Sequence, residues 1–383
     1  MKNSKKLVAL LLSLAMVFAL ASCGGGAGTS PSPSVSPSAS TPVEPTTPAD
    51  GLVIPEGTYL ALVTDVGNID DKSFNQGSYE GMVAFAEANN IDYDYFRPSE
   101  DSDASRVETI TTAIEENGAT VIVCPGFMFA QAITDVQDKF PEVMFLGLDL
   151  TTGDLTPSAN TTLISYQEEQ AGYLAGYAAV KDGYTKLGFL GGMAVPAVIR
   201  FGYGFVQGAD AAAAEAGITV DIKHWYGNSF GPTDDVKVKM DSWYADGTEV
   251  VFACGGGIYL SAIAAADAAS GKVIGVDVDQ SAESPLIITS ATKGLGSSVG
   301  TALTALYENG GAAWPAEYAG QQKVLGAAEG GVGLPTAEGS WRLANYTVDQ
   351  YNELFAKVKD GSVAISSDIA NPPAADIAVD YQN

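Results

Sequence analysis

The sequence predicts an α/β fold of two similar lobes, each a parallel sheet flanked by helices. Two observations support this fold class. Strand-like and helix-like segments alternate along the body of the 383-residue chain, as they do in parallel α/β sheets. One strand–helix–strand pattern also occurs twice, at 118–149 and again at 247–277, and closes each time on an aspartate. A single doubly wound sheet with an accidental repeat is the alternative.

The first segment, 1–22, is typical of a secretory signal rather than of the fold. Three lysines precede an apolar run over 7–21, which is short for a membrane-spanning helix. Cys23 follows a small-residue exit, and this arrangement resembles the bacterial lipobox, which implies lipid on that cysteine. A plain signal peptide with an incidental cysteine is the alternative. We therefore expect a chain anchored by lipid to the extracytoplasmic face of the cell membrane.

Residues 23–57 are predicted to form a spacer behind the anchor. Gly, Ser, Pro and Thr dominate the segment, so it has too little apolar surface to offset the entropy of ordering. Its prolines favour an extended chain. Such a spacer holds a folded domain away from the bilayer, which suits the thick-walled surface of a Gram-positive cell.

The most informative segment is 60–81. Leu60–Val63 form a short apolar run that predicts a buried strand, and a helical pattern begins at Phe74 after a polar loop. Asp65, Phe74 and Asn75 are therefore expected where a strand gives way to a helix. In open α/β sheets, ligands bind at this edge.

Asp71 is expected to play a different part from Asp65. Asp71 and Ser73 stand just before the predicted helix, where short polar side chains cap the first turn. We therefore expect Asp65 to contact ligand and Asp71 to serve local structure, although a capping or turn role is the alternative for Asp65 as well.

Strand ends in the repeated units supply further candidates. Asp149 and Asp277 close equivalent strands, and Gly256 follows another strand, where the missing side chain lets backbone amides approach a ligand. Lys293 lies further on, in a chain with only 19 basic residues. A cleft holding several acids needs a compensating cation, so we expect Lys293 to serve the site, the alternative being an ordinary exposed lysine.

Two glycine patterns are assigned to packing. Gly172 and Gly176 are four apart on a predicted helix, so they share one face and permit close packing, for which we expect a sheet as the partner, packing on the hinge side of the lobes being the alternative. The run at 202–208 superficially suggests a dinucleotide-binding loop. Its spacing is wrong and no acid closes the preceding strand, so we expect no such cofactor.

The segment at 60–81 closely resembles the signature of the basic membrane protein family. The blocks at 166–176, 202–208 and 275–280 resemble further motifs of the same family. These proteins are lipid-anchored substrate-binding proteins of ABC transporters and include purine nucleoside receptors. The resemblance implies a type I periplasmic-binding-protein-like fold whose chain crosses between the lobes three times.

On this basis the lobes can be assigned along the chain. Lobe one is expected to hold residues 58–162 together with about 291–310. Lobe two is expected to hold residues 163–290 together with about 311–383.

The resemblance also implies how a ligand is held. Receptors of this family clamp the base between two aromatic rings, one from each lobe, which match Phe74 and Phe230 here. Trp225 and Tyr226 are the alternatives for the second ring, and core packing is the alternative for either. Stacking of this kind contributes about 1–3 kcal/mol per base.

The acids and the lysine match further positions of the family's site. Asp65 and Asp149 match polar ligands of the base or sugar, and Lys293 matches a lysine near the ligand. Asp277 is the candidate for the ribose diol, because a carboxylate can accept two charge-assisted hydrogen bonds from vicinal hydroxyls.

Composition narrows the partners. The formal charge of −27 argues against nucleic acid and against anionic membrane surfaces as partners. One histidine and three cysteines offer no zinc cluster, so no metal is expected. Cys124 and Cys254 lie in apolar strand-like runs and are expected to be small buried thiols, a disulfide being the alternative.

The function implied by the resemblance is capture of a nucleoside, expected to be a purine, and its delivery to an ABC permease. A binding protein for a sugar or another small polar metabolite is the first alternative, and a nucleoside hydrolase is the second. No P-loop or His–Glu metal motif occurs in the sequence. We therefore expect a monomeric binding protein without enzymatic activity or cofactor.

Overall fold

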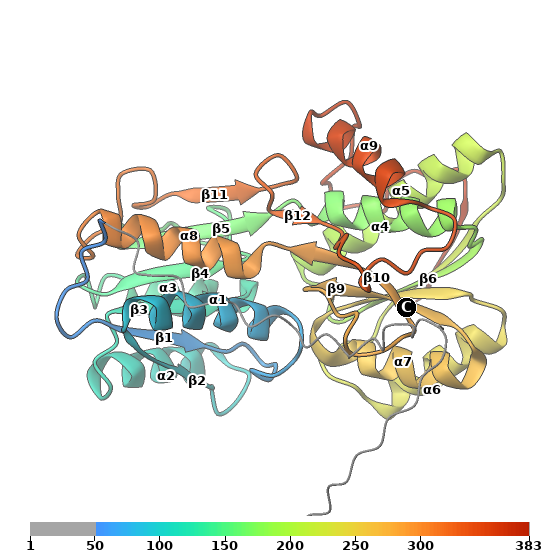
Figure 1. Cartoon of the computed structure of the whole chain (residues 1–383). Coiled ribbons are helices and arrows are strands. Elements are labelled where there is room, and N and C mark those ends of the chain that lie inside the picture. Colours follow the sequence, from blue (N-terminus) through green and yellow to red (C-terminus); the bar gives the residue numbers. More distant parts are fainter. Residues whose placement is uncertain (1–50, 383) are drawn as a thin grey trace, which may run out of the picture. The chain divides into compact units, whose positions relative to one another are not determined.

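The computed structural model describes residues 51–382. The predicted signal, the lipid site at Cys23 and nearly all of the predicted spacer lie outside the described residues. In the described part, the strands form two sheets, each covered by its own helices (Figure 1). No helix in this part of the chain is long and apolar enough to cross a membrane.

The first sheet has six parallel strands in the order β11-β5-β4-β3-β1-β2. Its strands are β1 (Tyr59–Val63), β2 (Asp92–Phe96), β3 (Val121–Pro125), β4 (Met144–Leu148), β5 (Thr161–Tyr166) and β11 (Gln322–Leu325). Its helices are α1 (Phe74–Asn89), α2 (Asp103–Glu115), α3 (Ala130–Val136) and α8 (Leu295–Glu308), with the 3₁₀ turn η1 (Phe127–Phe129) after β3. Strands β3, β4 and β5 are buried along their whole length, as expected for a sheet covered on both faces.

The second sheet has seven strands in the order β12-β10-β9-β8-β6-β7-β13, and only β12 is antiparallel. Its strands are β6 (Lys186–Gly191), β7 (Asp221–Tyr226), β8 (Val250–Cys254), β9 (Lys272–Asp277), β10 (Ile287–Lys293), β12 (Val332–Gly333) and β13 (Ala378–Gln382). Its helices are α4 (Glu168–Asp182), α5 (Pro196–Ala216), α6 (Asp234–Ala245), α7 (Tyr259–Ala269) and α9 (Val348–Lys359), with the 3₁₀ turn η2 (Gly256–Ile258) after β8.

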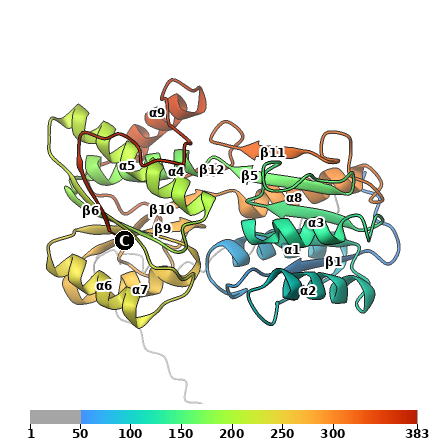
Figure 2. The same cartoon turned by 180° about the vertical axis from the view of Figure 1, so that it is seen from behind.

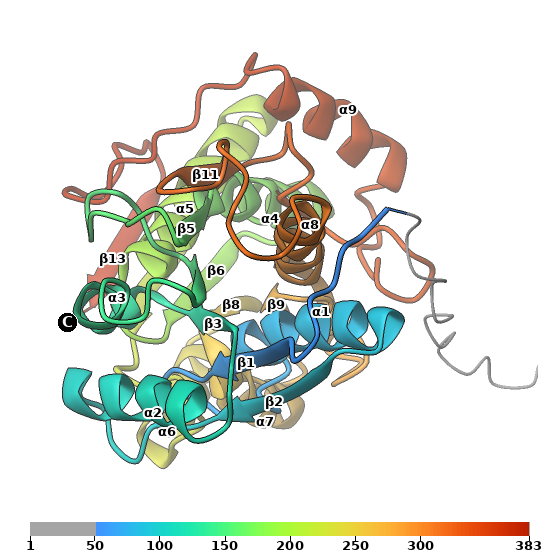
Figure 3. The same cartoon turned by 90° about the vertical axis from the view of Figure 1, so that its left-hand side faces the viewer.

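Each sheet is sandwiched between two helix pairs because alternate strand residues point to opposite faces. In β1, Leu60 and Leu62 join the core under α1 and α8, whereas Ala61 and Val63 join the core under α2 and α3. The second sheet buries one face under α4 and α5 and the other under α6 and α7. Figure 2 shows α6 and α7 together on one face of this sheet, and Figure 3 shows α1 beside α8.

The repeated order of elements confirms the predicted two-lobed α/β fold. Strand order β4-β3-β1-β2 in lobe one corresponds to β9-β8-β6-β7 in lobe two. The equivalent helices α2 and α6 even begin alike, since the side chains of Ser102 and Thr233 each accept a hydrogen bond from a backbone amide three residues on. The free thiols Cys124 and Cys254 are buried at equivalent strands, which confirms their prediction as small core residues.

The chain passes between the two sheets three times, from β5 to α4, from β10 to α8 and from β11 to β12. Strand β5 continues to Tyr166, beyond the predicted boundary at 162. Strand β11 falls in the range predicted for lobe two but pairs with β5 of lobe one. This short edge strand has no counterpart in the internal repeat, so the sequence pattern does not indicate its sheet.

Helices α4 and α5 approach unusually closely through glycines. A Cβ atom at Gly208 would lie 1.9 Å from the carbonyl oxygen of Tyr173, and one at Gly172 would lie 2.1 Å from that of Phe201. The expectation of a sheet as the partner of Gly172 and Gly176 was wrong, because the partner is a helix. The run at 202–208 lies inside α5 and faces α4, which agrees with its exclusion as a cofactor loop.

We predict that Gly208→Ala destabilises the protein by about 1–3 kcal/mol or more, because the added methyl forces two packed helix backbones apart. Gly300→Ala in α8 is the matched control, since a Cβ there meets open space. It should be neutral or stabilising by up to about 1 kcal/mol, because alanine loses less backbone entropy in a helix. Urea unfolding of both variants measures the difference, and equal stabilities would show that the helix contact tolerates a side chain.

Candidate functional site

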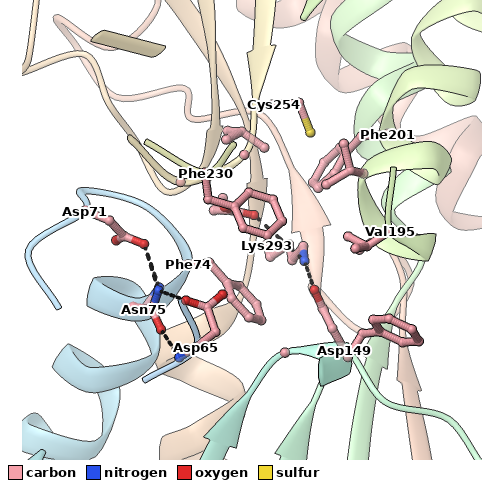
Figure 4. Close-up of a pocket in the computed structure, with 18 of the residues that line it drawn as sticks. Asp65, Asp71, Phe74, Asn75, Asp149, Val195, Phe201, Phe230, Cys254 and Lys293 are labelled. Atoms are coloured by element: carbon pink, nitrogen blue, oxygen red, sulfur yellow. Dashed lines mark hydrogen bonds and ion pairs between the residues drawn. The ribbon is translucent and has the colours of Figure 1, made fainter. Parts of the chain in front are cut away.

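The candidate site is a cavity at the carboxyl ends of the strands of both sheets. Figure 4 shows side chains from both lobes converging on it. All eight residues predicted to bind ligand line this one cavity: Asp65, Phe74, Asn75, Asp149, Phe230, Gly256, Asp277 and Lys293. Their meeting follows from the parallel sheets, which bring the carboxyl ends of successive strands to one edge. Ligand contact by each of them stays a prediction.

Asp65 is held by a polar network at the start of α1. Its Oδ1 accepts hydrogen bonds from the Asn75 side-chain amide, at 2.7 Å, and from the Gly67 backbone, at 2.6 Å. The Asn75 amide also donates to Asp71, and its carbonyl accepts from the Asp65 backbone. Asn75 is thus already engaged in positioning Asp65. The other oxygen of Asp65, Oδ2, lies near Gly126, and both residues line the cavity.

Asp71 caps the helix, as the sequence predicted. Its carboxylate accepts hydrogen bonds from the backbone amides of Ser73, Asn75 and Gln76, which are among the amides that the first turn of α1 leaves unpaired. Asp71 also lines the cavity, which the prediction of a purely local role did not include.

The two aromatic candidates face the cavity from opposite lobes. Phe74 is the first residue of α1, and Phe230 lies in the loop that follows β7 (Figure 4). The loop packs on glycine, since a Cβ at Gly192 would lie 2.6 Å from the Phe230 ring. Trp225 and Tyr226, the alternatives to Phe230, lie within β7 and are not among the residues that line the cavity.

Asp149 and Asp277 occupy equivalent positions with the same backbone conformation. Each directly ends its strand in the left-handed region, with φ of 56° and 67°, where residues other than glycine are uncommon. Such strain is typical of residues held in place for function. Oδ2 of Asp149 lies 2.6 Å from Nζ of Lys293, whereas its Oδ1 is buried and has no hydrogen-bond partner among the described residues. This oxygen is available to a donor on a ligand.

Lys293 is the cation at the centre of the site. Besides Asp149, its Nζ lies 3.4 Å from Glu168 and 3.8 Å from Asp277, and it sits 4.6 Å from the centre of the Phe74 ring. Burial alone lowers the pKa of a lysine, but the three carboxylates outweigh it and raise the pKa of Lys293. Burial raises the pKa of Asp149, a shift that Lys293 opposes and Glu168 increases. The lysine therefore stays charged.

Two hydrogen bonds join the lobes across the mouth of the site. Ser73 of lobe one donates to Oδ2 of Asp277 in lobe two at 2.6 Å. The Gln280 side-chain amide of lobe two donates to the backbone carbonyl of Lys72 in lobe one at 2.8 Å. These contacts and the Asp149–Lys293 pair hold the lobes together around the cavity.

The sequence analysis missed part of the site. Phe201, Val195 and Val198 form an apolar wall on and before α5, and Phe127 and Met128 follow β3. It also missed the buried pair of Glu168 with Arg200, whose Nε lies 2.5 Å from the Glu168 carboxylate. The scarcity of basic residues was the signal available for Arg200, as it was for Lys293.

The buried carboxyl of Glu169 is expected to make the free energy of unfolding depend on pH. It is 3% exposed, its Oε2 has no partner in the described part of the chain, and burial raises its pKa from 4.5 to about 7. A carboxyl whose pKa is raised by folding favours the native state below its unfolded pKa, and this contribution is lost as the pH rises through the folded value.

We therefore expect Glu169→Gln to be close to neutral near pH 5 and to stabilise the protein by up to about 3 kcal/mol near pH 8. Urea unfolding of wild type and variant at both pH values measures this. The exposed Glu116 gives the control Glu116→Gln, for which we expect a change within about 0.5 kcal/mol at either pH. A Glu169→Gln effect independent of pH would contradict a raised pKa.

The fold and the interlobe cavity define a class of protein. A crystal structure described as ABC transporter system solute-binding proteins, from Aeropyrum pernix K1, superposes with a TM-score of 0.70 at 22% identity, covering 81% of this chain and 94% of that chain. At this identity the likeness establishes the fold, which is the two-lobed fold of solute-binding proteins.

The family to which the chain belongs is a narrower group than the proteins that share this fold. The family model for ABC transporter substrate-binding proteins of the PnrA-like type, Bmp, matches residues 59–366, and the chain belongs to this family. This confirms the resemblance noted at 60–81.

Two relatives illustrate the membership. The ABC transporter nucleoside-binding protein BmpA of Lactococcus lactis subsp. cremoris is 32% identical over 233 residues, which cover 57% of this chain and 64% of that protein. Basic membrane protein A1 of Borrelia garinii subsp. bavariensis is 31% identical over 244 residues, covering 63% of this chain and 70% of that protein. The matched region thus spans somewhat less than two thirds of the first relative's length.

Proposed function

We propose that this protein captures a nucleoside, with a purine base preferred, between its two lobes and delivers it to an ABC permease. The observation that carries the proposal is the pairing of Phe74 and Phe230, one ring from each lobe, in a cavity where Asp149 keeps a carboxylate oxygen without a hydrogen-bond partner among the described residues. A flat base is covered by two rings, and a ribose diol is a donor to carboxylates. The nucleoside-binding relative from Lactococcus supports the same ligand class.

In this proposal the ligand closes the lobes by stabilising the closed state. Phe74 and Phe230 cover the faces of the base. Asp65 and Asp149 accept hydrogen bonds from the base or sugar, Asp277 accepts from the ribose hydroxyls, and Lys293 donates to the ligand. The backbone at Gly256 is exposed to the ligand because glycine has no side chain, and a side chain there would also meet the Phe230 carbonyl, 2.5 Å from a Cβ atom.

Calorimetric titration of the folded chain with inosine, guanosine, adenosine, cytidine and uridine tests the proposal. We expect at least one purine nucleoside to bind with a Kd well below millimolar, and free ribose to bind more weakly because it offers no base to the rings. Failure of every nucleoside to bind more tightly than millimolar would overturn the nucleoside assignment. Tighter binding of ribose or another sugar would favour the sugar-binding alternative.

The proposal includes binding without chemistry. Chromatography of inosine after long incubation with the protein separates a receptor from a nucleoside hydrolase, since a receptor returns the nucleoside intact. Release of hypoxanthine at a rate that scales with protein concentration would overturn this part of the proposal.

We also propose attachment to the outer face of the membrane through lipid on Cys23, with the folded domain acting as a monomer. The small-residue exit before this cysteine supports the anchor. Fractionation of cells that express Cys23→Ala tests it: the protein should leave the membrane fraction, and full retention there would contradict a lipid anchor.

A further inference from the structure

Glu168 is a fully enclosed carboxylate that lies behind the cavity. It is 0% exposed, and among the described residues neither it nor Arg200 belongs to the cavity lining. Its two oxygens are divided between two cations: Oε2 lies 2.5 Å from Nε of Arg200, and Oε1 lies 3.4 Å from Nζ of Lys293. An enclosed carboxylate is costly unless it is paired, so this division is a built arrangement.

We propose that Glu168, held in place by Arg200, is a positioning residue that sets where the ammonium group of Lys293 lies in the ligand cavity. The inference rests on the proposed function only in taking the cavity as a ligand site. It assigns a role to two residues that do not line the cavity, and it makes the lysine's location depend on them.

Lysine needs such positioning more than arginine does. Its ammonium is a compact charge on a flexible stem with three donors, so nearby charges rather than the stem's geometry decide where it rests. Here the Asp149 carboxylate of lobe one lies 2.6 Å from Nζ, and the Glu168 carboxylate of lobe two lies 3.4 Å from it. Without the negative charge on Glu168, Nζ is held by Asp149 and Asp277 alone and moves deeper between them.

Arg200 holds the Glu168 carboxylate in place. It lies in the second turn of α5, and the glycine-mediated contact of α4 with α5 keeps the two helices in fixed register. Glu168 is the first residue of α4, immediately after the first passage between the lobes, and Lys293 is the last residue of β10, immediately before the second. The Glu168–Lys293 contact therefore joins two of the three segments that connect the lobes, and it does so beside the cavity.

A purely structural role for Glu168 makes different predictions. A carboxylate in the first turn of a helix stabilises that helix through its dipole, and a buried ion pair broken at one end destabilises the fold. Either effect lowers the stability of the protein, but neither changes the affinity of the molecules that remain folded. Affinity therefore separates the hypotheses.

Calorimetric titration of Glu168→Gln with inosine, guanosine and adenosine, at temperatures where the variant is folded, is the first arm. We expect affinity to fall about tenfold or more, because a misplaced ammonium loses its charge-assisted hydrogen bond to ligand. Glu169→Gln is the matched control, with the same chemical change one residue on, in the same buried turn. It should change affinity less than about twofold, since Glu169 forms no ion pair with Lys293.

The pH dependence of affinity sharpens this arm. Six charged or titratable groups act on Asp149 or are acted on by it, namely Lys293 on β10, Glu168 on α4, Asp277 on β9, Tyr166 on β5, Arg200 on α5 and Cys254 on β8. Binding should weaken towards acid as Asp149 is protonated, and because the charge of Glu168 raises the pKa of Asp149, Glu168→Gln should move this loss to lower pH. Glu169→Gln should leave it in place. An unchanged affinity and an unchanged pH profile in Glu168→Gln would overturn the proposal.

Arg200 provides a second pair of variants in case Glu168→Gln does not fold. Arg200→Met releases the Glu168 carboxylate and should weaken binding in the same direction, whereas Arg200→Lys keeps a cation beside it and should recover most of the affinity. Equal affinities for Arg200→Met and wild type would show that Glu168 needs no fixing.

A crystal structure of Glu168→Gln without ligand separates this inference from the proposed function. If wild type binds none of the nucleosides, the proposed function fails, but the position of Lys293 still shows whether Glu168 sets the place of its ammonium group. We expect Nζ of Lys293 to be displaced relative to wild type crystallised in the same form. A lysine in its original place between Asp149 and position 168 would overturn the inference whatever the ligand proves to be.

Discussion

Replacement of Phe74 with alanine is expected to weaken nucleoside binding about 10- to 100-fold while leaving the fold intact. The expected loss corresponds to one stacked ring, about 1–3 kcal/mol. Phe74 is only partly buried and its ring borders the cavity rather than the centre of a core, so its removal leaves little unfilled space inside the protein. Calorimetric titration with the tightest-binding nucleoside measures the effect, and urea unfolding verifies the fold.

Two further variants test whether the ring itself matters. Phe74→Leu retains apolar bulk without an aromatic face and should lie between alanine and wild type, and Phe230→Ala should match Phe74→Ala because it removes the opposite ring. Phe355→Ala removes a partly buried ring on α9, which is not part of the cavity lining, and serves as the control. Wild-type affinity in Phe74→Ala would refute an aromatic clamp.

Replacement of Lys293 with methionine is expected to give the largest loss of stability, about 3–5 kcal/mol near pH 8. The stem of the side chain is kept, but the carboxylates of Asp149, Glu168 and Asp277 lose the cation that they share. The loss should be smaller near pH 5.5, because carboxylates left without a cation can be protonated there instead of remaining buried as ions. Urea unfolding at both pH values measures it.

An exposed ion pair provides the control for the stability loss expected in Lys293→Met. Lys237 pairs with Asp241 on the exposed side of α6, and Lys237→Met there should cost less than about 1 kcal/mol. If Lys293→Met cost no more than this, the buried cluster would contribute nothing measurable, and Lys293 would be a residue of the binding site alone.

Much of the fold could be predicted because it is repeated. The two strand–helix–strand units gave the same order of elements twice, and a parallel sheet places the carboxyl ends of its strands at one edge. This placed Asp65 and Asp149 in lobe one, and Asp277 in lobe two, independently of any family match. Lys293 was indicated by the scarcity of basic residues beside several acids, whereas Phe230 needed the family resemblance.

Some features of the site and fold could not be predicted because they depend on contacts between segments that are distant in the sequence. Nothing local marks Glu168 as different from Glu169, yet Glu168 forms ion pairs with Arg200 and Lys293, whereas Glu169 forms an ion pair with neither. The difference arises only when α5 places Arg200 beside the first turn of α4. The glycines of α4 signalled a close approach, but not that a helix would be the partner. The edge strand β11 lacked both a repeat and an apolar run.

The final strand, β13, has a consequence for the behaviour of the chain in concentrated solution. It pairs with β7 from Ala378 opposite Asp221 to Gln382 opposite Trp225, which leaves only the last residue of β7 without a partner, and Trp243 donates to the Gln382 side chain. An uncovered β7 would present a row of unpaired backbone groups beside aromatic side chains, which is a template for pairing with another molecule. β13 is itself an edge strand, but shortening the tail past Ala378 would place β7 and its aromatic side chains at the edge instead, so we expect oligomers whose separate ligand cavities remain intact.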